Sequence, residues 1–457
     1  MTLDKRNKIA ILGYGVEGKS ILNYLLKHGY SEVTVCDSNV DIEADLPKGV
    51  SASCGPEYLD GLADFEVIFR SPGVRYLEPQ IQLAVENGVK VTSCIGFFID
   101  QCLAPVVGVT GTKGKGTTAT LIFEMLKKAG KKAYLGGNIG EPPTDFLDEV
   151  KGSDIVVLEL SSFQLQDLGV SPQYAVLLNT TTDHLDYHED RGEYLRAKEA
   201  LLAHQGAKDV AVLNADYEYF KYYKPLVKGE LRTVSVEGKV KDGAYVEGDA
   251  IFYCKGGACE EVMPVSEVAL IGSHNLENVL PAVTVARELG VKVADVAEVV
   301  REFKGLPHRL EFVKEVEGVR FYNDSFSTTT ETSMAAVDSF DEPLILIAGG
   351  SDKGLDYGEW AVRILTKRNL ETVILIGETA DKMEAELLEA EGKLGEAEGS
   401  PTKILRRPDL GEAILTAFAE SEAGSVVVMS PAAASFDLFE NYKKRGEEFR
   451  AVVRALR

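Results

Sequence analysis

One stretch constrains the fold of this chain more than any other, and it reads PVVGVTGTKGKGTTAT from residue 105 to 120. A short apolar run opens there into a glycine-rich turn, which ends in a lysine and two threonines. This order predicts a buried strand, a loop whose backbone N–H groups surround phosphate oxygens, and a helix that begins at the loop. We therefore expect a parallel α/β domain with a nucleotide phosphate site at Gly111, Thr112, Lys113, Gly114, Lys115, Gly116 and Thr117.

The loop departs from the usual phosphate-binding pattern at two positions. Val109 occupies the place of the first glycine, and Gly116 stands where Ser or Thr normally ligates Mg²⁺. Thr117 or Thr118 would then have to supply the missing hydroxyl. A glycine-rich turn that holds no ligand is the competing interpretation.

Composition limits the class of protein. The 457 residues are 45% hydrophobic and 26% charged, which predicts a globular protein of two to four domains. A net charge of −23 excludes nucleic acid and anionic membrane as general partners. A charged N-terminal start and the lack of a long apolar run predict a cytoplasmic protein with no membrane insertion. No CxxC pair is present, so we expect all six cysteines to be reduced thiols.

The N-terminal region carries a second nucleotide-type pattern. After an apolar strand from Lys8, the chain reads Gly13-x-Gly15-x-x-Gly18, followed by an amphipathic pattern and a second strand that ends at Asp37. This arrangement indicates a phosphate-bearing nucleotide at a helix N-terminus without identifying which one. Considered alone, it favours a nicotinamide dehydrogenase.

Polar residues follow the predicted strands of the central region. Glu159 ends one apolar run, and Asp183 and His184 follow another. Strand ends of a parallel sheet meet at one edge, so these side chains are expected to provide ligands beside the phosphate loop. The alternation from about Thr233 to Val262 predicts a small antiparallel sheet.

A third unit is expected after residues 304–309, where Gly and Pro interrupt a helix. Apolar runs alternate there with helical patterns, which predicts parallel α/β structure with strands at Val319–Asn323, Leu344–Gly349, Val373–Gly377 and Ser425–Ser430. The acidic segment from Met383 to Gly399 is interpreted as a solvated helical face and loop.

Together these segments resemble one family, the ATP-dependent Mur ligases of bacterial peptidoglycan synthesis. The resemblance spans nearly the whole chain and rests on twelve segments in the family's order: GYGVEGKS, RSPGV, GVTGTKGKGTT, GGNIG, ELSSFQL, DHLDYH, EYLRAKEAL, GSHNLEN, GLPHRLE, YNDS, AGGSDKG and SPAAASFDLFENYKKRGEEF.

The resemblance implies an α/β protein of three domains. Residues 1–96 would form a Rossmann-like domain that binds a UDP-linked substrate. Residues 97–304 would form a P-loop ATPase domain with a small antiparallel sheet, and residues 305–457 a C-terminal Rossmann-like domain that binds glutamate and ATP.

The same resemblance implies an amide-bond ligase. It would add D-glutamate to UDP-N-acetylmuramoyl-L-alanine through an acyl phosphate, splitting ATP with the help of two Mg²⁺ ions. Such a phosphoryl transfer depends mainly on positioning and charge stabilisation. The implied enzyme is a bacterial cytoplasmic monomer whose partners are small molecules only.

The matching motifs also imply which residues form the sites. The implied catalytic residues are Lys115, Glu159, His184 and Lys198, and the implied metal ligands are Thr117, Glu159, His184 and a carbamylated Lys198. The implied ATP contacts beyond the loop are Asn275, Asn278, Arg309 and Asp324. Contacts to the UDP-linked substrate are Val16, Asp37, Ser38, Ser71, Pro72, Gly73 and Asn138, and contacts to glutamate are Thr328, Lys353, Ser435 and Phe436.

The glutamate segment departs from the family pattern. Members that add D-glutamate usually have a lysine and an alanine after the Asp-Ser pair, but here Phe326 and Ser327 follow, and then Thr328 and Thr329. This sequence resembles that of the family branch that adds L-glutamate, so addition of L-glutamate remains an alternative. Another ligase of the superfamily, a dehydrogenase and a non-catalytic protein with the ligase fold are further alternatives.

Overall fold

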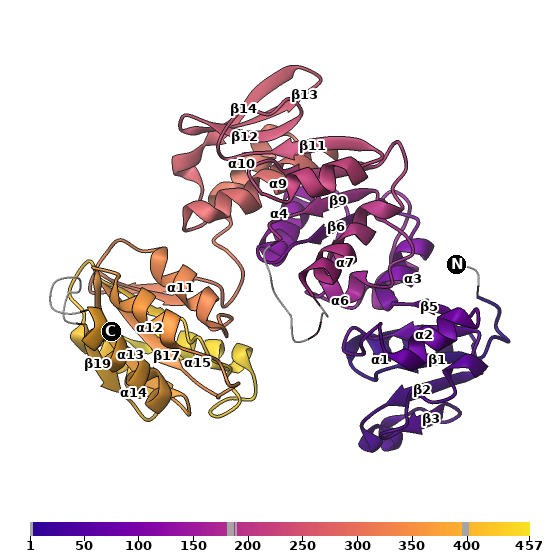
Figure 1. Ribbon diagram of the computed structural model, residues 1–457. Coiled ribbons are helices and arrows are strands. Elements are labelled where there is room, and N and C mark those ends of the chain that lie inside the picture. Colours follow the sequence, from indigo (N-terminus) through magenta and orange to yellow (C-terminus); the bar gives the residue numbers. More distant parts are fainter. Residues whose placement is uncertain (1–2, 181–186, 188–189, 395–401) are drawn as a thin grey trace. The chain divides into compact units, whose positions relative to one another are not determined.

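The computed structural model describes residues 3–180, 187, 190–394 and 402–457. The chain forms two compact units (Figure 1). The first comprises Met1–Val268 and Ser273–Glu302, and the second comprises Ala269–Gly272 and Phe303–Arg457. Each unit is built around parallel sheets, as the alternation of apolar runs and helical patterns predicts.

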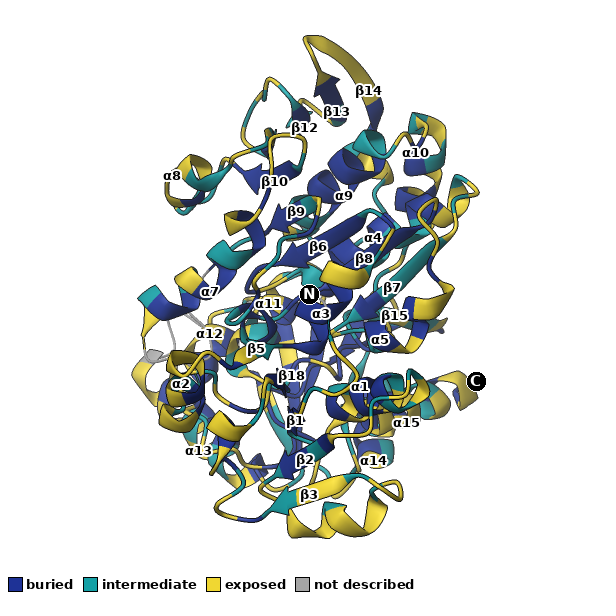
Figure 2. Cartoon of the chain, turned by 90° about the vertical axis from the view of Figure 1, so that its right-hand side faces the viewer, coloured by how far each residue is buried: buried dark blue, intermediate teal, exposed yellow. Residues whose placement is uncertain are grey.

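The first sheet of unit 1 is parallel throughout, with the order β3-β2-β1-β4-β5. Its strands are β1 (Ile9–Leu12), β2 (Val33–Asp37), β3 (Ser51–Cys54), β4 (Val67–Arg70) and β5 (Lys90–Thr92), and its helices are α1 (Val16–Lys27) and α2 (Pro79–Glu86). Figure 2 shows β1 in the buried colour and the edge strand β3 largely exposed. The predicted second strand that ends at Asp37 is confirmed.

The second sheet of unit 1 is also parallel, with the order β11-β10-β9-β6-β8-β7. Its strands are β6 (Val106–Thr110), β7 (Ala133–Gly137), β8 (Ile155–Glu159), β9 (Tyr174–Leu177), β10 (Val210–Asn214) and β11 (Glu230–Val234). The associated helices are α3 (Cys94–Gln101), α4 (Lys115–Lys128), α5 (Pro143–Phe146), α6 (Ser162–Leu165), α7 (Arg191–Ala203), α8 (Phe220–Tyr223), α9 (Leu276–Glu288) and α10 (Val293–Glu302).

The small antiparallel sheet is present but begins later than predicted. It contains β12 (Gly243–Glu247), β13 (Ala250–Lys255) and β14 (Ala258–Pro264). The start near Thr233 was wrong, because Thr233 lies in β11, which pairs with β10 in the parallel sheet. The expectation of six reduced cysteines was also wrong. The β13–β14 hairpin places Cys254 directly opposite Cys259, and the two form a disulfide.

Unit 2 contains one six-stranded sheet with the order β15-β16-β20-β17-β18-β19. Its strands are β15 (Glu311–Val316), β16 (Val319–Asn323), β17 (Leu344–Gly349), β18 (Leu370–Ile376), β19 (Lys403–Arg406) and β20 (Val426–Met429). Only β15 runs antiparallel to its neighbour within the part of this sheet that the structure describes. The helices are α11 (Thr330–Asp338), α12 (Gly358–Leu365), α13 (Ala380–Leu394), α14 (Leu410–Glu420) and α15 (Tyr442–Ala455).

The sheet of unit 2 is buried on both faces by separate apolar clusters. Trp360 and Met383 belong to the cluster on one face, and Ile414 and Phe449 belong to the cluster on the other. Met383 is fully buried, so the acidic segment that begins there is not solvated on every side.

The three-domain α/β fold class is confirmed, whereas the boundaries at residues 96/97 and 304/305 remain predictions. Among the described residues, no helix combines the length and the apolar character that a membrane span requires.

Candidate active site

The phosphate loop lies between β6 and α4, at the carboxyl edge of the central sheet. Gly111 has φ 152° and Gly114 has φ 84°, a backbone conformation that favours glycine. Space requires glycine at both positions too. A Cβ on Gly111 would lie 2.7 Å from the Leu178 Cβ, and one on Gly114 would lie 1.9 Å from the Asn278 Oδ1. The sequence thus builds a loop whose backbone can approach a phosphate closely.

Lys115 is the first residue of α4, and its side chain turns back over the loop. The Nζ donates hydrogen bonds to the carbonyl oxygens of Gly111 at 3.1 Å and Thr112 at 2.9 Å. The ammonium group is therefore held at the loop, where a nucleotide phosphate would meet it.

The two threonines after Lys115 have different surroundings. The Thr118 hydroxyl donates to the carbonyl oxygen of Asn278 at 3.2 Å, and its side chain is fully buried against α9. Thr117 is buried too, with 8% of its surface exposed.

Glu159 ends β8, where it pairs in register with Val109 of β6. Its side chain is 2% exposed, and Oε1 accepts a hydrogen bond from the Asn138 Nδ2 at 3.2 Å. Among the described residues, the buried Oε2 has no hydrogen-bond partner. A buried carboxylate oxygen with spare capacity is the kind of ligand that Mg²⁺ prefers, so these residues fit a metal beside the phosphate loop.

Asn138 is fixed by the same strand end. Its backbone N–H donates to the Glu159 carbonyl oxygen at 2.9 Å. The preceding Gly137 has φ 95°, and a Cβ there would lie 2.2 Å from that carbonyl oxygen. The GGNIG segment therefore needs its glycine to bring the Asn138 amide against the carboxylate.

Lys198 is buried rather than on the surface. It projects from α7 with only 1% of its surface exposed, and its Nζ donates to the Gly111 carbonyl oxygen at 3.2 Å. The Nζ also lies 4.4 Å from the centre of the Tyr194 ring. The structure thus brings Lys198 to the phosphate loop, although Lys198 and Gly111 are 87 positions apart in sequence.

His184 and the rest of the DHLDYH segment, apart from Tyr187, lie outside the described residues. Within the described ranges, no group of three or more His, Cys, Asp or Glu side chains could hold a metal ion. The predicted second metal site therefore remains a prediction.

Two asparagines on α9 and the turn before it lie at the phosphate loop. The Asn278 Nδ2 donates to the Asn275 Oδ1 at 2.9 Å, and the Asn278 side chain packs against Gly114. The predicted ATP residues of unit 1 are therefore brought together.

The residues predicted to bind the UDP-linked substrate surround the carboxyl edge of the first sheet. Asp37 accepts hydrogen bonds from the backbone N–H groups of Tyr14 at 2.7 Å and Asn39 at 2.8 Å. The Ser71 hydroxyl donates to the Gly13 carbonyl oxygen at 2.9 Å. Val16 is 72% exposed, and Ser38 is exposed too. Asp37 therefore organises the first loop through its carboxylate.

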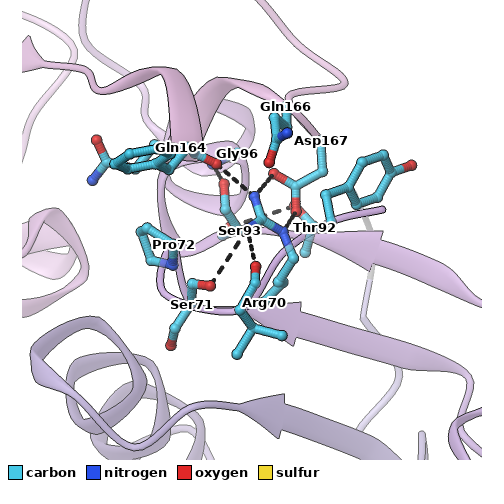
Figure 3. A network of polar contacts seen from close by, with 12 residues as sticks. Arg70, Ser71, Pro72, Thr92, Ser93, Gly96, Gln164, Gln166 and Asp167 are labelled. Atoms are coloured by element: carbon cyan, nitrogen blue, oxygen red, sulfur yellow. Dashed lines mark hydrogen bonds and ion pairs between the residues drawn. The ribbon is translucent and has the colours of Figure 1, made fainter. Parts of the chain in front are cut away.

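Sequence reasoning missed a buried ion pair beside these residues. Arg70, directly before Ser71, is bidentate to Asp167 and lies at the centre of a polar network (Figure 3). No local pattern marks this pair, because 97 residues separate its members.

Glu17 is a second group that the sequence did not single out. It accepts a hydrogen bond from the Gln164 Nε2, and its Oε2 is buried without a partner among the described residues. Burial raises the pKa of Glu17 to about 7, against the smaller opposing effects of Gln164 and Arg70.

In unit 2, the predicted ATP residues lie around the end of β16. Asp324 accepts hydrogen bonds from the Ser430 hydroxyl at 2.7 Å and from the Leu310 backbone at 3.1 Å. Burial raises the pKa of Asp324 to about 6. The Arg309 guanidinium stacks 3.8 Å from the centre of the Phe326 ring, and that ring makes an edge contact with Tyr442 at 5.1 Å.

The predicted glutamate residues of unit 2 lie on three loops. Lys353 is exposed and lies 6.0 Å from the centre of the exposed Phe436 ring, whereas Ser435 is buried. The Thr328 backbone N–H donates to the Phe326 carbonyl oxygen. Lys353 and Phe436 are thus brought together.

A buried arginine that the sequence did not single out holds two of these loops. The Arg445 side chain donates to the carbonyl oxygens of Ser325, Ala433 and Ala434 at 2.9–3.1 Å. Burial lowers the pKa of Arg445 to about 10.

Comparison with known families accounts for most of the chain. The model of the Mur ligase middle domain matches residues 109–286, and that of the Mur ligase MurD-like N-terminal domain matches residues 7–93. The model of the Mur ligase glutamate ligase domain matches residues 308–433.

Individual relatives match over the full length. The chain is 38% identical to the UDP-N-acetylmuramoylalanine–D-glutamate ligase of Acetivibrio thermocellus, over 99% of this chain and 97% of that protein. It is also 38% identical to the enzyme of the same name from Symbiobacterium thermophilum, over 99% and 98%. The fold is similar to that of the MurF ligase from Thermotoga maritima in complex with ADP, with a TM-score of 0.57 and 19% identity over 98% of this chain and 94% of that one.

Proposed function

Since the chain belongs to the Mur ligase family, we propose that it adds D-glutamate to UDP-N-acetylmuramoyl-L-alanine with hydrolysis of ATP, in peptidoglycan precursor synthesis. The observation that carries the proposal is the convergence of Lys115, Glu159 and Lys198 on one phosphate loop. The full-length relatives named for this reaction supply the substrates.

The chemistry follows from what each group can do. A carboxylate is a poor acyl donor, so the substrate carboxylate first attacks the γ-phosphorus of ATP, releases ADP and forms an acyl phosphate. The glutamate amine then attacks the acyl carbon, and phosphate leaves from the tetrahedral intermediate. Lys115 and the loop N–H groups would stabilise the charge on the phosphoryl oxygens during the first step.

Mg²⁺ would be held by Glu159 and Thr117, whose oxygens suit a hard cation. When bound, the ion neutralises phosphate charge and orients the oxygens. A second ion would require His184 and a carbamylated Lys198. The burial of Lys198 at the loop supports the carbamate, since a buried amine more readily loses its proton to become the reactive neutral form.

Substrate binding is divided between the units in this proposal. Unit 1 would bind the UDP moiety through Val16, Asp37, Ser38 and residues 71–73, with Asn138 toward the muramoyl end. Thr328, Lys353, Ser435 and Phe436 of unit 2 would bind glutamate, and Arg309 and Asp324 would contact ATP.

Addition of L-glutamate is the second candidate, because a specific observation favours it. Phe326 replaces the lysine that is usual in members that add D-glutamate, and the Arg309 guanidinium stacks on the Phe326 ring. A dehydrogenase is not favoured, since relatives and family models across the whole chain are ligases.

The test is phosphate release from ATP and Mg²⁺ with UDP-N-acetylmuramoyl-L-alanine, run in parallel with D-glutamate and L-glutamate. We expect release with the D isomer and not with the L isomer. Preference for the L isomer would assign the chain to the second candidate, and no release with either would refute the ligase proposal.

We further propose a bacterial cytoplasmic enzyme that acts as a monomer. ATP and a UDP-linked precursor are cytoplasmic metabolites, and a single chain contains every predicted site residue. Sedimentation at the assay concentration would test the monomer, and a dimer there would refute it.

A further inference from the structure

Residues 71–73, which are predicted to hold the UDP-linked substrate, belong to a loop that a buried ion pair ties to the central region. Arg70 donates through Nε to the Asp167 Oδ2 at 2.8 Å and through Nη2 to the Asp167 Oδ1 at 2.9 Å. Both side chains are inaccessible to solvent, at 0% and 1% exposure. A bidentate pair of this kind fixes orientation as well as distance.

The same guanidinium holds backbone on both sides of the contact. Its Nη1 donates to the Val74 carbonyl oxygen at 2.7 Å, on the substrate loop. Its Nη2 donates to the Phe163 carbonyl oxygen at 2.6 Å, in α6 of the central region. Figure 3 shows Arg70 between the two segments, with Ser71 and Pro72 on one side and Asp167 on the other. The contacts leave the loop little freedom to shift against α6.

Tyr187 adds a second clamp on the substrate loop. Its hydroxyl lies 3.1 Å from the carbonyl oxygens of both Pro72 and Val74, and 3.4 Å from the Arg70 Nη1. Its ring packs against Phe163, with centroids 4.2 Å apart. The carbonyl groups of the loop are thus directed toward the central region rather than toward solvent.

The central partner of this clamp lies on the segment that carries Glu159. Residues 159–167 pass from the end of β8 through α6. A capping box between Ser161 and Gln164 caps the N-terminus of this helix. Gln164 also donates to Glu17 in the first turn of α1, beside the other predicted substrate loop. One short segment therefore contacts both substrate loops and presents the carboxylate at the phosphate loop.

We propose that Arg70 and Asp167 are positioning residues that align the carboxylate of the bound UDP-linked substrate with the nucleotide at the phosphate loop. This inference rests on the proposed function. UDP itself would be held by Asp37 and residues 71–73, which stay together on the first sheet because the Ser71 hydroxyl donates to the Gly13 carbonyl oxygen. A shift of the first sheet against the central region would therefore leave the UDP contacts in place. The pair would act on alignment, because it fixes the first sheet to the segment that carries Glu159.

This role predicts a separation of kcat from binding. A displacement of about 1 Å costs on the order of 100-fold in rate. Arg70→Lys keeps the charge but loses the bidentate geometry, and Asp167→Asn keeps the shape but loses the charge. We expect each variant to lower kcat about 100-fold while the Kd for UDP, measured by calorimetry, stays within twofold. The double variant should be no worse than either single variant, because the pair acts as a unit.

The matched control is the ion pair between Lys27 and Asp148. It too joins the N-terminal region to the central region, but from α1 and not from β4. Its Nζ–Oδ2 distance is 2.6 Å, but Lys27 is 69% exposed. An exposed pair contributes little, so Lys27→Gln should leave both kcat and the UDP Kd unchanged.

Several outcomes would overturn the inference. An unchanged kcat in folded Arg70→Lys and Asp167→Asn would do so, and so would a UDP Kd that rises in parallel with the loss of kcat. If thermal melts show that these variants do not fold, Tyr187→Phe decides, since it removes only a hydroxyl. It should lower kcat about tenfold at constant UDP Kd, and an unchanged kcat there would overturn the inference. Failure of the ligase proposal is distinguishable, because it would be seen as no turnover in the unsubstituted enzyme.

Discussion

The stack of Arg309 on Phe326 gives a prediction whose size can be worked out from the structure. The guanidinium carbon lies 3.8 Å from the ring centre, and the ring is 38% exposed. A cation–π contact at a partly exposed site contributes about 0.5–1 kcal/mol. If the ring holds Arg309 in the orientation that contacts ATP, Phe326→Leu should raise the KM for ATP about twofold to fivefold.

A second readout separates this contact from simple packing. The Phe326 ring also meets the edge of Tyr442 at 5.1 Å, a contact that contributes about 0.5–1.5 kcal/mol. Phe326→Leu loses both contacts, whereas Tyr442→Leu keeps the Arg309 stack and loses the edge contacts of Tyr442 with Phe326 and, at 6.2 Å, with His308. Urea titration should therefore find Phe326→Leu destabilised by about 1–2.5 kcal/mol, and of the two variants only Phe326→Leu should raise the KM for ATP.

The assay is ATP-dependent phosphate release at saturating UDP-linked substrate and glutamate. Phe326→Trp keeps an aromatic face under Arg309 and should retain the original KM for ATP. The reasoning is refuted if Phe326→Leu has the stability loss but an unchanged KM for ATP, because the stack would then be structural only.

Three further predictions follow from buried groups of unit 1. Glu159→Gln should lower phosphate release at least about 100-fold and abolish the rise in melting temperature that Mg²⁺ and ATP together produce, as measured by calorimetry. Lys198→Ala should be inactive and should recover partly with added short carboxylic acids, and full activity without them would contradict the carbamate. Burial raises the folded pKa of Glu17 from 4.5 to about 7, so its contribution to stability is present below pH 4.5 and is lost as the pH rises to about 7. In urea titrations at pH 4.5 and 8, Glu17→Gln should reduce the fall in the free energy of unfolding between the two pH values by up to about 3 kcal/mol. An unchanged pH dependence of stability would contradict the raised pKa of Glu17.

Local patterns were sufficient for the parts of the fold that local chemistry determines. The strand, glycine turn and helix around Lys115, and the glycine fingerprint that ends at Asp37, were both predicted where the structure has them. In each case, the glycines are required by a left-handed φ or by close contact within a few residues.

The errors fall where long-range pairing decides. Residues 230–234 have the alternation of an antiparallel strand, but β11 pairs in parallel with β10 and continues the central sheet. Cys254 and Cys259 are not part of a metal-binding or redox sequence motif, yet the register of the hairpin places them opposite each other. Register is a property of two strands together, so neither segment reveals it alone.

In the candidate site too, local residue chemistry was predictable from the sequence, whereas long-range contacts were not. Lys198 has the sequence context of a surface lysine on a helix, and only the packing of α7 against the phosphate loop shows that it is buried. Arg70 lies in the RSPGV segment, but its role is not predictable from that segment, because its partner Asp167 is 97 positions away. Residue chemistry was predictable, whereas the contacts that align the reacting groups were not.

Packing distinguishes the two threonines that could supply the hydroxyl missing from the phosphate loop. Thr117 and Thr118 are equivalent by composition, and both follow Gly116. Successive side chains of a helix point about 100° apart, so the two threonines of α4 meet different neighbours. The Thr118 hydroxyl donates to the Asn278 carbonyl oxygen, a contact that holds α9 to α4. This contact directs the Thr118 side chain toward α9. We therefore propose Thr117 as the metal ligand of α4, one position beyond Gly116 within the first helical turn.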